Sequence, residues 1–251
     1  MIMSQFDTLA EAYEETTRRF PFREHIEAHS LLDQIGPLDG LAVLDLGCGS
    51  GVYARRLRRL GAARAVGVDA SAGMIEHAEK LERVEPLGVR YAAADASLGL
   101  GPDLSGAFDL VVGVYLTPYA ATAEELTGIF RTARQALKPT GGRFVAAVLN
   151  PGHDRAPGYY QRYGFDIICE PDDEADGAPV DLSGSIDDHD FLLHGYRWSK
   201  PTHERALRAG GFSAATWVRP TLSDEGRRLH PEDYWARYLA RPHALILEAG
   251  A

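Results

Sequence analysis

A short apolar run that ends in three closely spaced glycines constrains this sequence more than any other feature. The segment from Val43 to Gly51 reads VLDLGCGSG, a buried strand followed at once by glycines at 47, 49 and 51. Glycines at such positions let the backbone turn sharply and approach a ligand closely. Residues 52–60 have helical spacing. Strand, glycine loop and helix together predict a ligand site at the carboxyl end of an open α/β sheet.

Short apolar runs and stretches of helical spacing alternate through most of the chain. Strands are predicted at 41–46, 65–68, 89–94, 108–114, 143–149, 212–218 and 243–248, and helices at 52–60, 71–81, 122–137, 201–209 and 231–239. Ser71 is placed to cap the helix that it precedes. Because strands that alternate with helices are joined by right-handed crossovers, we expect an α/β fold with a mostly parallel sheet covered by helices on both faces.

Two segments depart from this alternation. Apolar positions at helical spacing, interrupted at Pro21, predict two helices ahead of the first strand. We expect these helices to form an N-terminal cap that consists of residues 1–37. The apolar positions are Phe6, Leu9, Tyr13, Phe22, Ile26, His29 and Leu32. Residues 151–199 are rich in Gly, Asp and aromatic side chains, with apolar runs at 164–169 and 191–198 around an acidic loop at 172–181. We interpret them as a strand pair or lid inserted into a single domain of residues 1–251.

Three acidic residues end three successive predicted strands or lie just inside their ends. Asp45 precedes the first glycine by two residues, Asp69 ends the second strand, and Asp95 follows the third. A carboxylate at position 45 disfavours a phosphate and favours a cation. Asp69 can accept from two ribose hydroxyls, and Asp95 from an adenine amine. A ligand with an amine, a ribose and an adenine but no phosphate fits S-adenosylmethionine. The alternative is that Asp69 and Asp95 cap helices or solvate loops.

These motifs resemble those of the class I S-adenosylmethionine-dependent methyltransferases, over essentially the whole chain. The resemblance rests on the glycine loop, the acids, FDLVV at 108–112 and LKPTGG at 137–142, where Thr140 replaces the glycine more common in the family. It implies a Rossmann-like sheet of seven strands, mostly parallel with an antiparallel last strand. A narrower similarity is to toxoflavin synthase-like small-molecule N-methyltransferases; it rests on residues 6–13, PFRE at 21–24, VYLTPYA at 114–120, Asn150-Pro151 and Tyr234-Trp235.

The family resemblance also implies where the cofactor lies. Gly47 and Gly49 would contact its methionine part, Asp45 its ammonium group and Asp69 its ribose. Ala70 or Met74 would lie near its adenine. The other expected cofactor contacts are Tyr13, Arg23, Cys48, Asp95, Ala96, Val114 and Tyr119. Three of these have an open alternative: Tyr13 packs between helices, Arg23 is solvated on its helix, and Cys48 is a small loop residue and no nucleophile.

The expected methyl acceptor is a small planar heterocycle or aromatic molecule, because aromatic walls suit a flat ring. The expected acceptor contacts are Tyr115, Asn150, Tyr159, Tyr160, His194, Tyr196 and Trp198. Alternatively, the residues of 191–198 merely pack a strand. His153 is the candidate general base, although an acidic ring N–H needs none. We expect N-methylation in secondary metabolism. The alternatives are O- or C-methylation, or a non-catalytic S-adenosylmethionine-binding module.

Charge and cysteine content narrow the classes of partner. The chain has 26 Lys and Arg against 36 Asp and Glu, a net charge of −10, which opposes binding to nucleic acid or to an anionic membrane. Two cysteines are too few for a disulfide framework. Asp187, His189 and His194 lie close together in sequence but lack a closed ligand set, so no metal is expected. We expect a cytoplasmic monomer or homodimer that acts on a small molecule.

Overall fold

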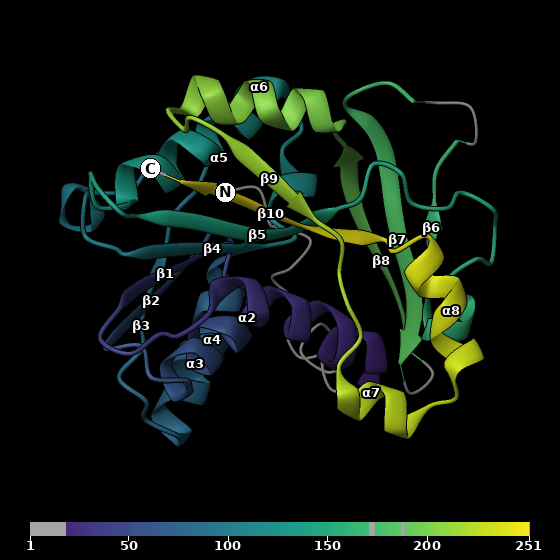
Figure 1. Cartoon of the computed structure of the whole chain (residues 1–251). Coiled ribbons are helices and arrows are strands. Elements are labelled where there is room, and N and C mark those ends of the chain that lie inside the picture. Colours follow the sequence, from purple (N-terminus) through teal and green to yellow (C-terminus); the bar gives the residue numbers. More distant parts are fainter. Residues whose placement is uncertain (1–18, 171–173, 187–188, 251) are drawn as a thin grey trace.

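A seven-stranded sheet forms the centre of the structure (Figure 1). The computed structural model describes residues 19–170, 174–186 and 189–250. The strand order is β3-β2-β1-β4-β5-β10-β9, and β10 runs antiparallel to both of its neighbours while the other strands are parallel. The strands are β1 (Ala42–Leu46), β2 (Arg64–Asp69), β3 (Arg90–Ala93), β4 (Leu110–Val114), β5 (Arg143–Leu149), β9 (Ala215–Val218) and β10 (Ala244–Gly250).

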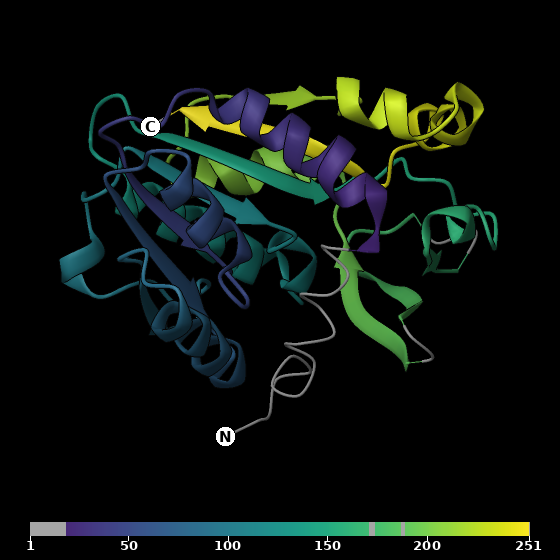
Figure 2. The same cartoon turned by 90° about the horizontal axis from the view of Figure 1, so that it is seen from below.

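Helices cover both faces of this sheet, as Figures 1 and 2 show from two directions. One face carries α2 (His29–Ile35), α3 (Val52–Arg59) and α4 (Ala72–Val84), and the other carries α5 (Ala123–Ala136) and α6 (Lys200–Gly210). Alternation along the strands explains the two layers: Leu44 and Leu46 pack in the core that contains α5 and α6, whereas Val43 packs with residues of α2 and α3. The predicted Rossmann-like fold is confirmed.

The segment between β5 and α6 folds as a second, antiparallel sheet of three strands. These are β6 (Phe165–Ile168), β7 (Ala178–Ile186) and β8 (His189–Arg197), in the order β6-β7-β8. The two predicted strands correspond to β6 and β8, but the expectation that they pair is wrong, because β7 lies between them and pairs with both. The expectation of an acidic loop up to residue 181 is wrong from residue 178 onward, because Ala178 and Val180 are buried and alternate with exposed Pro179. The small sheet stands beside the carboxyl ends of the central strands (Figure 1).

An aromatic cluster joins the small sheet to the rest of the molecule. It packs β6, β7 and β8 against the π-helical turn η1 (Arg23–Ala28) and the C-terminal helix α8 (Glu232–Ala240). Its largest buried members are Phe20, Phe22, Tyr160, Tyr163, Phe165, Phe191, Trp235 and Tyr238. Large aromatic side chains bury much apolar surface each, so this cluster holds the small sheet beside Leu149, the last residue of β5.

Most predicted boundaries agree with the structure to within a few residues. The predicted cap is present, since the Ser71 hydroxyl accepts a hydrogen bond from the Met74 amide at 3.1 Å. Helix α7 (Asp224–Leu229) and the short turns η2 (Pro102–Leu104), η3 (Thr117–Tyr119) and η4 (Gln161–Tyr163) were not predicted. The helix expected around Phe6 to Tyr13 lies outside the described residues.

None of the helices within the described ranges is long and apolar enough to span a membrane.

Candidate active site

The glycine loop after β1 is held tightly against β2. The amides of Gly47 and Cys48 both donate to the carbonyl of Val68, at 2.8 and 2.9 Å. Gly47 has φ of +75°, and a Cβ at this position would lie 2.9 Å from Leu116 Cδ1. Both the backbone conformation and the nearby side chain therefore require glycine here. The loop can face a ligand with backbone alone, as the sequence pattern predicts.

Asp45 is buried, and among the described residues only one of its two carboxyl oxygens has a hydrogen-bond partner. Its Oδ2 accepts a hydrogen bond from the Ala54 amide at 2.8 Å, while Oδ1 has no hydrogen-bond partner among the described residues. Burial is the main reason that the pKa of Asp45 is raised to about 7, and the nearby charge of Asp69 adds to it. A buried acceptor without a partner is unfavourable. The ammonium group of S-adenosylmethionine would supply both the donor and the positive charge, so the site fits this cofactor.

Asp69 and Asp95 are oriented by hydrogen bonds from their own loops. Asp69 Oδ2 accepts from the Gly49 amide and Oδ1 from the Ser71 amide, both at 2.8 Å. Asp95 Oδ1 accepts from the Ser97 amide at 2.8 Å and from its hydroxyl at 2.7 Å. These bonds order the loops that follow β2 and β3, whereas the alternative expected from the sequence was that the two carboxylates cap helices or solvate loops. Both carboxylates nevertheless line the same cavity, so ordering the loop and binding a ligand are compatible at each position.

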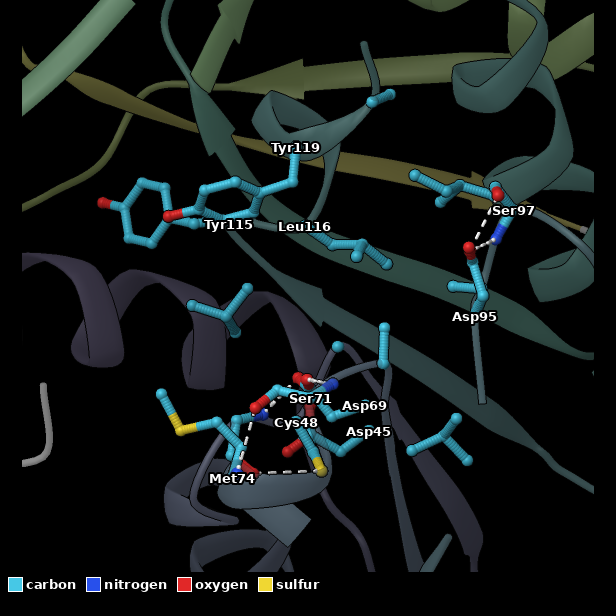
Figure 3. A pocket seen from close by; sticks show the side chains of 18 of the residues that line it. Asp45, Cys48, Asp69, Ser71, Met74, Asp95, Ser97, Tyr115, Leu116 and Tyr119 are labelled. Carbon is cyan, nitrogen blue, oxygen red and sulfur yellow. Dashed lines mark hydrogen bonds between the residues drawn. The ribbon is translucent and has the colours of Figure 1, made fainter. Parts of the chain in front are cut away.

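A cavity of about 540 Å³ lies between the glycine loop, the ends of β2 and β3, and the loop after β4. This volume is within the range of about 300–1,000 Å³ that is usual for small-molecule sites. Figure 3 shows Asp45, Asp69 and Met74 on one wall, with the rings of Tyr115 and Tyr119 across from them. The expected cofactor residues that line it are Arg23, Asp45, Gly47, Cys48, Gly49, Asp69, Ala70, Met74, Asp95, Ala96, Val114 and Tyr119. Tyr13 lies outside the described residues.

Cys48 lines this cavity as a buried thiol. Burial and the nearby carboxylates of Asp45 and Asp69 raise its pKa well above the usual value, so the thiol stays protonated. Its Sγ donates to the Gly49 carbonyl at 3.5 Å. These features fit a small loop residue and not a nucleophile.

A second, smaller cavity adjoins the first beneath the small sheet. It has a volume of about 70 Å³ and shares Arg23, Tyr115, Tyr119 and His194 with the larger cavity. Its other walls are largely apolar and aromatic: Phe20, Phe22, Pro118, Leu149, Phe165, Ile167, Val180, Leu182, Phe191, Leu193 and Gly195, with Asp181 and His243. A flat apolar group that enters from the larger cavity would meet aromatic faces here.

The residues expected to contact the acceptor divide into two groups. Tyr115, His194 and Tyr196 line the cavities. Asn150, Tyr159, Tyr160 and Trp198 line neither cavity and make structural contacts instead. The Asn150 amide group donates to the Pro242 carbonyl at 2.7 Å, and the Trp198 indole donates to the Ala120 carbonyl at 3.0 Å. The hydroxyls of the two tyrosines donate to the backbone carbonyls of Arg237 and Arg241.

His153, the predicted general base, also lies outside both cavities. Its Nδ1 lies 2.9 Å from the Asn150 carbonyl and its Nε2 lies 3.9 Å from Cys169 Sγ. Burial lowers its pKa, which keeps the ring neutral. The structure therefore corrects this assignment: His153 fixes the turn after β5 and does not face a ligand.

Several residues of the cofactor cavity carried no signal in the sequence. Ser97 follows Asp95, while Glu125 and Ile129 come from the first turns of α5. Two buried polar residues beside the cavities, Glu27 and His243, were also missed. Glu27 lies on η1, and His243 directly precedes β10. Only the fold brings these residues, far apart in sequence, to one place.

The fold is Rossmann-like, and the residues of the cavity at its strand ends fit S-adenosylmethionine. A family model described as "Methyltransferase domain" matches residues 43–141, which span β1 to the turn before β5. Over this stretch, which is less than half of its length, the chain is similar to methyltransferase domains.

Curated proteins of similar sequence include a methyltransferase. The chain is 36% identical over 128 residues to a ubiquinone biosynthesis O-methyltransferase of Methylobacterium sp. (strain 4-46), a match that covers 49% of this chain and 47% of the relative. The chain thus spans about half the length of the curated relatives it matches.

Two solved structures share the fold over nearly the whole chain. An S-adenosylmethionine-dependent methyltransferase from Mesorhizobium loti has a TM-score of 0.63 at 23% identity, covering 90% of this chain and 97% of its own. The CcbJ methyltransferase from Streptomyces caelestis has a TM-score of 0.68 at 18% identity, covering 99% and 98%. At these identities the similarity is one of fold.

Proposed function

We propose that the whole chain transfers a methyl group from S-adenosylmethionine to a small planar acceptor. The observation that carries this proposal is the junction of the two cavities. The larger one has the buried acid and glycine loop that suit the cofactor, and the smaller one has apolar, aromatic walls. The two share Arg23, Tyr115, Tyr119 and His194, so a ring held in the smaller cavity faces the cofactor directly.

The acceptor atom that we favour is a ring nitrogen of a heterocycle, in a reaction of secondary metabolism. The similarity to toxoflavin synthase-like enzymes supports it, and two residues of the shared PFRE segment, Phe22 and Arg23, line the smaller cavity. A hydroxyl oxygen on an aromatic ring is the second candidate. The sequence similarity to the ubiquinone biosynthesis O-methyltransferase favours it. Both acceptors are flat, and a ring N–H, like an aromatic O–H, carries a proton on the atom that is methylated.

Adjacent leucines on β8 provide a matched test. Leu193 is 7% exposed and lines the smaller cavity, whereas Leu192, which points to the opposite face of the strand, is 43% exposed. A panel of planar N–H and O–H acceptors would be assayed by the formation of S-adenosylhomocysteine. Leu193→Ala should raise the KM of the acceptor about tenfold, roughly 1.4 kcal/mol, by removing apolar contact.

The control variant Leu192→Ala should leave that KM unchanged, and both variants should keep the wild-type affinity for S-adenosylhomocysteine. If the wild-type chain does not bind S-adenosylhomocysteine, or methylates no member of the panel, the proposed function is wrong. An equal increase in KM for both leucine variants would contradict the proposal that the acceptor binds in the smaller cavity.

A further inference from the structure

Four polar side chains from distant parts of the chain meet where the two cavities join. The Tyr115 hydroxyl donates to Glu27 Oε1 and lies 2.9 Å from His243 Nε2. His243 Nε2 is 3.2 Å from Glu27 Oε1, and His243 Nδ1 is 2.8 Å from the Tyr238 hydroxyl. The side chains of Glu27 and His243 are only 1% and 2% exposed. A polar group so deep in an aromatic core is unfavourable unless its bonds are satisfied, which marks this cluster as a candidate for function.

The hydrogen bonds are consistent with the following arrangement of protons. If the Tyr238 hydroxyl donates to Nδ1 of His243, the neutral imidazole carries its proton on Nε2 and directs it at Tyr115 and Glu27. Burial lowers the pKa of His243 well below its usual value, in agreement with a neutral ring. Tyr115 then donates to an ionised Glu27, whose Oε2 lies 3.5 Å from Arg23 Nε. Glu27 is therefore the acceptor at the end of a short chain of hydrogen bonds.

Tyr115 is the member of this cluster that lines both the cofactor cavity and the smaller cavity, whereas His243 lines only the smaller one. The φ of +53° at Tyr115 makes it the one residue other than glycine with a left-handed backbone among the residues that the structure describes. Such a conformation is uncommon for a bulky side chain, and it occurs preferentially at functional sites. The hydroxyl is thus in contact with the buried acid while its ring faces the space where the acceptor would bind.

We propose that Tyr115 and Glu27 form a proton relay that accepts the proton of the methyl acceptor. This proposal rests on the proposed function. The proton on the acceptor oxygen or nitrogen passes to Tyr115 Oη, and the original Tyr115 proton passes to Glu27 Oε1. His243 is a positioning residue, which holds the hydroxyl through Nε2. When bound, S-adenosylmethionine supplies the activated methyl carbon, to which the acceptor atom bonds while the electrons of the broken carbon–sulfur bond stay on sulfur.

Charge balance within the site supports this relay. Methyl transfer removes the positive charge of the sulfonium, and protonation of Glu27 removes one negative charge from the same enclosed region. The net charge of the site therefore stays constant, which avoids leaving an uncompensated charge in a low-dielectric environment. The relay also identifies the class of acceptor: a neutral ring with a weakly acidic O–H or N–H. A carbon nucleophile or an acceptor that is already an anion has no need of it.

The relay makes a specific prediction about pH. Burial is the largest effect on Glu27 and raises its pKa, while Arg23 and the Tyr115 hydrogen bond act in the opposite direction. The groups that face Glu27 are Arg23 on η1, Tyr115 after β4, His243 before β10 and Tyr238 on α8. Glu27 must be ionised to accept the proton. Activity should therefore fall as the pH drops through its raised pKa.

Glu27→Gln tests the relay, because glutamine keeps the shape but accepts no proton. General-base catalysis contributes about 10²–10⁴-fold. We expect at least a hundredfold lower kcat/KM for a weakly acidic acceptor and loss of the acid limb of the pH profile. For a nitro-substituted analogue that is already ionised, the loss should be less than tenfold. Glu24→Gln, on the same turn but paired with Arg56 on the surface, is the matched control and should behave as wild type.

A second readout does not depend on turnover. Infrared pH titration of the ligand-free protein should show a protonated carboxyl band that disappears in Glu27→Gln. The same band should titrate at higher pH in Tyr115→Phe, because the hydrogen bond from Tyr115 lowers the pKa of Glu27. No shift in Tyr115→Phe, or an equal loss of activity with both acceptors, would overturn the relay. If wild type binds no S-adenosylhomocysteine, the proposed function fails instead.

Discussion

Replacing Asp45 with asparagine should stabilise the ligand-free protein and weaken its binding of cofactor. The pKa of Asp45 is raised in the folded chain to about 7 from the usual 3.8. Between these values the folded state holds a proton that the unfolded state has released, so stability falls as the pH rises. Asparagine carries no charge at any of these pH values, and its side-chain oxygen can still accept from the Ala54 amide.

The size of the expected gain in the free energy of unfolding follows from the difference between the folded and unfolded pKa of Asp45. At pH 8 the ionised carboxyl lowers the free energy of unfolding by at most about 4 kcal/mol relative to a neutral group. Allowing for the amide N–H that asparagine would leave without a partner, we expect a net gain of about 2 kcal/mol. For a chain of this length that raises Tm by about 4–8 °C. The gain should shrink as the pH falls below 7 and disappear before the pH reaches 3.8, because below that value Asp45 is mostly protonated in both states and only the cost of the unpaired amide N–H is left.

The binding effect has the opposite sign. Loss of a charge-assisted contact to the cofactor's ammonium should weaken S-adenosylhomocysteine binding by about 1.5–3 kcal/mol, or roughly tenfold to a hundredfold. Thermal unfolding from pH 4 to 8 and calorimetry with S-adenosylhomocysteine measure the two effects. Asp109→Asn is the control: its ion pair with Lys138 lowers the pKa of Asp109, so its loss should destabilise the protein near neutral pH without changing cofactor affinity.

One result would refute this reasoning: an Asp45→Asn protein with the wild-type dependence of Tm on pH. The carboxyl would then be no more costly to ionise in the folded chain than in the unfolded one. Unchanged affinity for S-adenosylhomocysteine would separately exclude Asp45 from the ammonium site. Because stability and binding are expected to move in opposite directions, general damage to the fold cannot produce the predicted pattern.

Two further variants test the ribose contact and the helix packing. Asp69→Ala should weaken S-adenosylhomocysteine binding at least tenfold, about 1.4 kcal/mol, and calorimetry that shows wild-type affinity would contradict this. Gly210→Ala should lower the free energy of unfolding by about 1–3 kcal/mol, because the new Cβ would lie 2.9 Å from Phe130 Cβ where α6 crosses α5. Gly101→Ala, where nothing lies within 4 Å, is the control in denaturant titrations, and equal losses at both glycines would refute the packing argument.

The fold was predictable because its signals are local. Buried parallel strands read as continuous apolar runs, and the glycine loop marks the first crossover. Strand β7 was missed because its polar side chains, Asp181 and Ser183 among them, alternate with apolar ones in an acidic context. Helix α7 is a short surface turn with almost no apolar periodicity. Its Gly226, buried against His25, acquires its role from tertiary contact alone.

The cofactor cavity was predictable for the same reason, and the acceptor region was not. Asp45 and Asp69 lie at or near the ends of β1 and β2, and Asp95 follows β3; these strands end at one edge of a parallel sheet, so strand order alone places the three acids together. Aromatic content gave no such guide in the lid, where Tyr160 and Trp198 pack the core while Tyr196 lines a cavity. His153 and His243 are both single histidines at strand ends, and nothing local distinguishes the buried turn residue from the one beside the cavities.

The direction of β10 determines which of its two ends lies at the sheet edge beside the cofactor cavity. A parallel strand presents its last residue there, and its first residue lies at the opposite edge of the sheet. Seven residues of extended chain span about 23 Å, so a parallel last strand would carry His243 that far from Tyr115. Because β10 runs antiparallel, His243, which precedes it, lies beside Tyr115, which follows β4. The chain can therefore add a histidine from the start of its last strand to a site that also uses the exits of β1, β2 and β4.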